Sequence, residues 1–114
     1  YAGHNALARA KLAGETLEKR LKTDFPDLRT DYVGVSAIHR TDFERQLEPY
    51  EVRLRLAANA DTAQKAALIG EEVEALYTNG PAGGGGARKY VTELVGIVSV
   101  LVDRQKVIPE IVLF

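Results

Sequence analysis

The segment of this chain best suited to binding chemistry is a glycine-rich run followed by two cations. Residues 79–89 read NGPAGGGGARK. Consecutive glycines allow backbone amides to converge on an anion, and Arg88 and Lys89 add positive charge beside them. We therefore predict a site for a phosphate or for a carboxylate. Its candidate ligands are Asn79, Gly83, Gly84, Gly85, Gly86, Arg88 and Lys89.

This segment differs from two well-known phosphate-binding motifs. The loop GxxxxGK[ST] requires a hydroxyl residue directly after the lysine, whereas Tyr90 follows Lys89 here. A dinucleotide-binding fingerprint requires a strand before the glycines and a helix after them, which this sequence does not predict. Two other interpretations stay open: a flexible connection, or backbone packed so tightly against a companion domain that no side chain fits.

Other polar residues give weaker signals. His39 follows an apolar run, so it can act as a general base near neutral pH and joins the candidate ligand-binding residues. The simpler interpretation of His39, and of His4, is hydrogen bonding to backbone or solvent. Glu71, Glu72 and Glu74 have the oxygen ligands that divalent cations prefer, but a helix would place them on a solvated face. We predict no catalytic residue and no metal ligand.

Composition excludes several classes of function. The 114 residues form a single domain's length of chain, with 46% apolar and 27% charged residues as in ordinary globular proteins. Zero cysteines exclude disulfides, thiolate metal sites and cysteine nucleophiles. A net charge of -1 provides no basic field for nucleic acid. Because the sequence shows neither a membrane-spanning run nor a signal segment, we expect a cytoplasmic protein without membrane partners or a cofactor.

Apolar spacing predicts two helices. The first covers residues 5–22, with one apolar face and Asn5 as the N-cap residue. The second begins after Asp61 or Thr62 and ends at Asn79-Gly80-Pro81, where we expect Gly80 to adopt a left-handed conformation.

Strand patterns occur at 31–38, 50–58, 90–102 and 107–114, with a connecting loop at 39–49 and a turn at 103–105. Residues 50–58 alternate cleanly, which is typical of a strand with one face on a core. In 90–102 both alternate sets are largely apolar, so this strand must be covered on both faces. We therefore favour an oligomer interface there.

The predicted order becomes βαββαβ if one further strand precedes the first helix. This is the ferredoxin-like α+β sandwich, with two helices on one face of a mainly antiparallel sheet. That first strand would lie between the third and the last. The sequence contains no methionine and begins at Tyr1. We therefore expect a processed chain, one that lacks its start, or the C-terminal part of a longer protein.

Three segments carry a resemblance to a known family: YAG leading into ALARA at 1–10, the strand at 50–56, and EEVEALYTNGPAGGGG at 71–86. Together they resemble the C-terminal ferredoxin-fold domain of the AtuA family of acyclic terpene utilisation, over nearly the whole chain. The resemblance implies a large N-terminal α/β domain and a link to citronellol- and geraniol-type catabolism through CoA thioesters. It transfers no catalytic residue.

Three functions follow as expectations. The first is a non-catalytic structural module that packs against the companion N-terminal domain or a second copy of itself as a homo-oligomer. The second is an enzyme part, in which the glycine loop with Arg88, Lys89 and His39 holds the phosphate or carboxylate end of an acyl-CoA-like substrate. The third, by fold analogy alone, is a sensor of small ligands.

Overall fold

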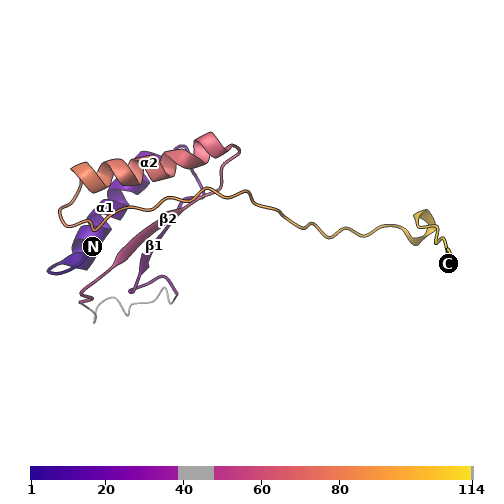
Figure 1. The fold of residues 1–114 in the computed structure, drawn as a ribbon, viewed down its shortest axis with the longest axis horizontal. Coiled ribbons are helices and arrows are strands. Elements are labelled where there is room, and N and C mark those ends of the chain that lie inside the picture. Colours follow the sequence, from indigo (N-terminus) through magenta and orange to yellow (C-terminus); the bar gives the residue numbers. More distant parts are fainter. Residues whose placement is uncertain (39–47, 114) are drawn as a thin grey trace.

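The computed structural model describes residues 1–38 and 48–113. Two helices and a two-stranded antiparallel sheet form an α+β body, and the chain after it leaves as an extended arm (Figure 1). We use "arm" for residues 90–113. The elements in chain order are α1 (Ala6–Leu21), β1 (Arg29–Val33), β2 (Arg53–Ala57), α2 (Ala63–Asn79) and the short 3-10 helix η2 (Arg104–Lys106).

Helix α1 forms where the sequence predicts it, because its apolar residues recur every three or four positions and one face can be buried. Lys19 and Arg20 in the last turn complement the helix dipole. The predicted cap at Asn5 is wrong in its mechanism: Asn5 lies in the left-handed region at φ 55° and its side chain makes no cap bond. Backbone contacts replace it, with the Ala6 amide donating to the Gly3 carbonyl at 3.1 Å.

Helix α2 begins with a confirmed cap. The Thr62 hydroxyl accepts a hydrogen bond from the Lys65 amide at 3.1 Å, which satisfies one of the free first-turn donors. The helix ends at Asn79 as predicted, but Gly80 is extended at φ -99°, so the left-handed ending is wrong. The reason is Pro81, since the residue before a proline is sterically pushed out of helical conformations toward extended ones.

The sheet pairs β1 with β2 from Arg29 opposite Ala57 to Val33 opposite Arg53. Strand β2 lies within the predicted strand at 50–58. Strand β1 overlaps the predicted strand at 31–38, but it begins at Arg29 and already ends at Val33. It stops because the chain turns: the amides of Val35 and Ser36 both donate to the Tyr32 carbonyl, and Gly34 adopts φ 100°.

The core lies between the helices and the sheet. Leu17, Phe25 and Val52 are its largest fully buried side chains. One cluster joins α1 to Leu76 of α2 and includes Phe25, which follows α1 in the chain. A smaller cluster joins the start of α1 to Val52. The buried hydrophobic residues are Ala6, Ala10, Ala13, Leu17, Leu21, Phe25, Val52 and Leu76.

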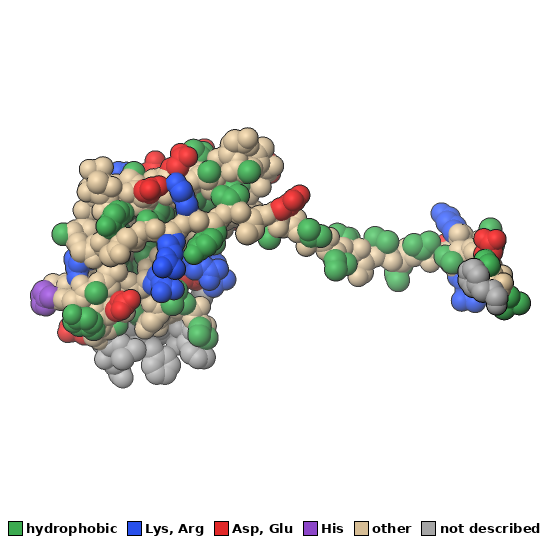
Figure 2. Space-filling model, viewed as in Figure 1, with side chains coloured by type: hydrophobic (Ala, Val, Ile, Leu, Met, Phe, Trp, Pro, Cys, Tyr) green, Lys and Arg blue, Asp and Glu red, His purple; other side chains and the backbone are tan. Residues whose placement is uncertain are grey.

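The arm forms no strand, so the two strands predicted at 90–102 and 107–114 are wrong over the described residues. A strand requires a hydrogen-bonded neighbour, and no segment within 1–38 or 48–113 pairs with the arm. Its apolar side chains are exposed, with Ile97 at 94% and Val95 at 90% (Figure 2). The predicted turn is present as η2, where the Asp103 carboxylate accepts from the Gln105 amide at 3.0 Å.

Within the described part of the chain, neither α1 nor α2 is long and apolar enough to cross a bilayer.

Candidate functional site

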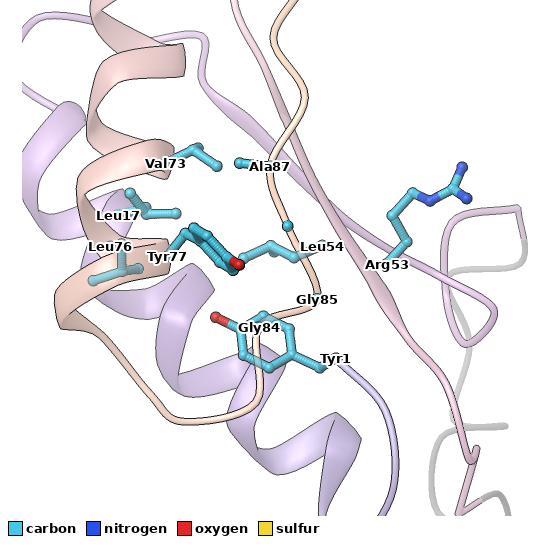
Figure 3. A pocket seen from close by; sticks show the side chains of 11 residues that line it. Tyr1, Leu17, Arg53, Leu54, Val73, Leu76, Tyr77, Gly84, Gly85 and Ala87 are labelled. Carbon is cyan, nitrogen blue, oxygen red and sulfur yellow. The ribbon is translucent and has the colours of Figure 1, made fainter.

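A groove of about 100 Å³ lies where α1, α2, β2 and the glycine segment approach one another (Figure 3). Its apolar side chains come from the chain start, both helices, β2 and Ala87, and glycine backbone and Arg53 complete the lining. Figure 3 shows the rings of Tyr1 and Tyr77 and the side chain of Leu54 meeting there. The lining residues are Tyr1, Leu17, Arg53, Leu54, Val73, Leu76, Tyr77, Gly84, Gly85, Gly86 and Ala87.

Tyr1 reaches the groove because the first residues of the chain pair with the segment before β2. The Tyr1 amine donates to the Val52 carbonyl at 2.9 Å, and the Val52 amide donates back to the Tyr1 carbonyl at 2.8 Å. An antiparallel bridge joins Ala2 to Glu51. Burial raises the pKa of the Tyr1 phenol, and the charge of Arg9 partly counteracts that rise. The phenol is therefore a neutral, half-buried group at the end of the groove.

Arg9 fixes the glycine segment to the body, a role that sequence analysis missed. Its guanidinium donates to the carbonyl of Ala82 at 2.7 Å, to that of Ala2 at 2.5 Å, and twice to that of His4 at 2.9 and 3.2 Å. The central carbon of the Arg9 guanidinium also lies 6.0 Å from the centre of the Tyr1 ring. The side chain thus joins the chain start, α1 and the glycine segment. The sequence feature that could have indicated this role is a positively charged residue directly before Ala10, which lies on the buried face of α1.

Gly83 allows this close approach. A side chain at Gly83 would collide with the Arg9 guanidinium, and the residue's φ of 86° also favours glycine. Because the Arg9 guanidinium donates to three backbone carbonyls on two segments, the chain start and the glycine segment, it serves here as a structural cross-link. It donates to main-chain acceptors that would otherwise need water.

The structure separates the residues predicted to bind an anion. Gly84, Gly85 and Gly86 line the groove, whereas Asn79 ends α2 with its side chain exposed, and Arg88 is exposed. His39 lies outside the described residues. The anion site stays a prediction.

Lys89 turns toward α2 rather than standing free. Its ammonium donates to the Glu74 carboxylate at 2.8 Å, and its aliphatic stem packs on Gly70. The hydrogen bond and the positive charge lower the pKa of Glu74, and the same contact raises the pKa of Lys89. A second ion pair joins Glu72 to Arg20 at 3.0 Å. Two glutamates of α2, Glu72 and Glu74, therefore form ion pairs with cations, and the described residues gather no cluster of three metal-ligating side chains.

The groove is too small for a typical small-molecule site. Pockets for drug-sized ligands and cofactors occupy roughly 300–1,000 Å³, whereas this groove holds about 100 Å³. Its walls are mostly apolar, and within the described part of the chain no nucleophile and base meet there. Its size and lining suit one or two aliphatic side chains inserted from a neighbouring segment.

Comparison with known protein families gives a match over nearly the whole chain. A family model described as "Acyclic terpene utilisation family protein AtuA" matches residues 1–113. No curated protein matches the chain. No solved structure matches it either.

Proposed function

The chain belongs to the acyclic terpene utilisation family AtuA, and we propose from this premise that it is a non-catalytic assembly module of an acyclic terpene utilisation protein. One observation carries the proposal: the arm exposes apolar side chains on both of its alternate faces. Contiguous exposed apolar surface of this kind marks contacts with another protein surface. The most exposed of these side chains are Leu101, Ile97, Leu113, Val95, Ile108 and Ile111.

The partner we propose is the companion N-terminal domain of the same protein, or a second copy of this chain. The body has its own core in α1, α2 and the sheet, so the arm is free to serve as a separate contact surface. The order of α1, β1, β2 and α2 agrees with the middle of a βαββαβ arrangement. The arm would complete that arrangement once a strand lies between it and β2.

Light scattering across a dilution series tests the assembly role. We expect the intact chain to self-associate or to bind the companion domain, and a variant that ends at Lys89 to do neither. The double variant Ile97→Asp with Leu101→Asp should behave like the truncation, since it charges two arm positions. Leu12→Asp is the matched control, because Leu12 is exposed on the body. A dilution-resistant intact monomer without affinity for the companion domain contradicts the proposal.

A second candidate function rests on the glycines that line the groove. In this alternative, Gly84, Gly85 and Gly86 hold the phosphate or carboxylate end of an acyl-CoA-like substrate while a larger domain carries out the chemistry. Gly85→Val tests it cleanly, because a side chain there would meet nothing within 4 Å and should leave folding intact. In the full-length protein we expect weaker substrate binding. Unchanged affinity refutes this role, and Gly96→Val on the arm is the control.

A further inference from the structure

We infer that the face of the sheet turned away from the helices is a docking surface, which binds an extended acidic segment of a partner protein through Arg53 and Arg55. This surface goes beyond the proposed assembly role, because it lies on the body rather than on the arm and recognises charge rather than apolar side chains. We call it the outer face, and its strand residues are Arg29, Asp31, Val33, Arg53, Arg55 and Ala57.

The alternation of side chains along the two strands defines this face. Successive residues of a strand point to opposite sides of the sheet, and residues directly opposite one another point to the same side. Leu54 packs against the core cluster that joins α1 to α2. Tyr32 lies opposite Leu54, and its hydroxyl lies against Gly14 of α1. Arg53 and Arg55 therefore point away from both helices, as Figure 3 shows for Arg53.

The two arginines carry charges for which the described part of the chain supplies no counterion. Arg55 lies directly opposite Asp31, the position from which a cross-strand ion pair would form. The Asp31 carboxylate instead accepts a hydrogen bond from Arg29 Nε on its own strand, at 2.9 Å. Arg53 lies opposite Val33, which carries no charge. Both arginines are exposed, and neither forms an ion pair with a described carboxylate.

Their position on a paired strand distinguishes these arginines from other cations of the body. Arg20 and Lys89 each form an ion pair with a glutamate of α2. Arg88 is exposed, but it lies outside any helix or strand. Arg53 and Arg55 belong to β2, which is paired with β1 along its whole length. Their backbone is therefore ordered before a partner binds, which lowers the entropic cost of binding.

Spacing and chemistry specify the partner. Because Arg53 and Arg55 are two residues apart on a strand, their Cβ atoms lie roughly 7 Å apart. An extended segment with carboxylates at alternate positions repeats that spacing, and the planar guanidinium can donate two parallel hydrogen bonds to each carboxylate. Val33 is exposed beside Arg53 and offers an apolar contact. Glu51 lies on the same side of the chain and limits the cationic surface to these two arginines.

Two acidic peptides of identical composition and charge test the inference at low ionic strength. Thr-Glu-Thr-Glu-Thr presents both carboxylates on one side of an extended chain, whereas Thr-Thr-Glu-Glu-Thr presents them on opposite sides. We expect the first to bind roughly three- to fivefold more tightly, which is the contribution of one exposed ion pair. NMR titration of the arginine side-chain Nε–H signals measures both affinities. The full chain carries Ile97→Asp and Leu101→Asp, so that association of the arm is measured separately from this surface.

A pair of double variants locates the binding on the outer face. Arg53→Gln with Arg55→Gln should weaken binding of the first peptide by roughly tenfold, since both ion pairs are lost. Arg104→Gln with Lys106→Gln removes the same charge from the arm and should change the affinity by less than about twofold. Circular dichroism checks that each variant is folded, which we expect because all four side chains are exposed.

Three outcomes overturn the inference. Equal affinity for the two peptides, or no binding of either, shows that the spacing of the arginines recognises nothing. Equal losses in the two double variants show an attraction to net charge alone. Inorganic phosphate that displaces the first peptide more strongly than chloride of the same ionic strength identifies a phosphate site instead of a docking surface. None of these results depends on whether the arm binds a partner, because the arm carries Ile97→Asp and Leu101→Asp throughout.

Discussion

The body and the arm are both rich in apolar residues, yet only the body buries them. In α1 the buried apolar residues share one face, and that face meets the sheet and α2. In residues 90–102 apolar side chains occupy both alternate faces, and the described chain supplies no element to cover either. An element with apolar side chains on one face needs a single neighbour to bury them, whereas an element with apolar side chains on both faces needs two. The arm is consequently the part of the described chain whose apolar side chains stay exposed.

The largest difference between the two regions should appear when the same leucine truncation is made in each. Leu17 is 1% exposed and Leu101 is fully exposed. Leu17→Ala should lower the free energy of unfolding by about 2–5 kcal/mol, since it removes buried contacts and leaves a cavity. Leu101→Ala should change it by less than about 0.5 kcal/mol. Urea unfolding followed by circular dichroism measures both, and a comparable loss at Leu101 would show that the arm packs in the isolated chain.

Replacing one glycine in each region by alanine should give a smaller difference in stability. In an exposed helix, Gly→Ala usually stabilises by about 1 kcal/mol, but at Gly14 the new methyl would collide with the Tyr32 hydroxyl and crowd Leu54. Gly14→Ala should therefore destabilise the body by about 1–3 kcal/mol, as overpacking does. At Gly96 on the arm, nothing lies within 4 Å. Thermal unfolding should show no loss there, and stabilisation by Gly14→Ala would contradict the packing of α1 on the sheet.

The same contrast explains how far the sequence predicts the fold. Both helices and both paired strands were predictable, because residues such as Leu17 and Leu54 belong to one-sided patterns that determine local structure and packing together. The arm strands were not, since a strand forms only beside another strand, and the sequence of one segment does not say whether its neighbour is present. Local chemistry also changed two helix ends. Asn5 is itself left-handed rather than a side-chain cap, and Pro81 holds Gly80 extended.

The candidate site was predictable only in its backbone. In the structure Gly84, Gly85 and Gly86 line the groove, and Gly83 allows the close approach of Arg9, while the anion site itself stays a prediction. Its charged neighbours were not predictable. The long side chain of Lys89 reaches Glu74 on α2, and that of Arg9 reaches three separate backbone carbonyls. These partners are up to 73 residues away in the sequence.

Arg9 tests whether the glycine segment belongs to the body or to the arm. Arg9→Gln removes the charged fork that donates to Ala82, Ala2 and His4, and we expect a loss of about 1–2 kcal/mol in the free energy of unfolding. The NMR order parameters of the backbone amides at residues 82–86 should also fall. Arg88→Gln is the control and should change stability by less than about 0.5 kcal/mol, because Arg88 is exposed. Equal effects of both variants would contradict the role of Arg9 as a cross-link.

The smallest expected effect lies where the body ends and the arm begins, at the pair of Glu74 and Lys89. Because the pKa of Glu74 is lowered in the folded chain, its contribution to stability is present above its ordinary pKa and is lost as pH falls through the lowered value. The raised pKa of Lys89 acts at the other end of the scale, since its contribution disappears as pH rises through that value. Lys89→Gln should therefore return the pKa of Glu74 toward its ordinary range, which NMR titration of the Glu74 carboxyl carbon measures. Lys106→Gln, in η2, should leave that titration unchanged. If Lys89→Gln also left it unchanged, the ion pair would not persist in solution, and the arm would separate from the body before Lys89 rather than after it.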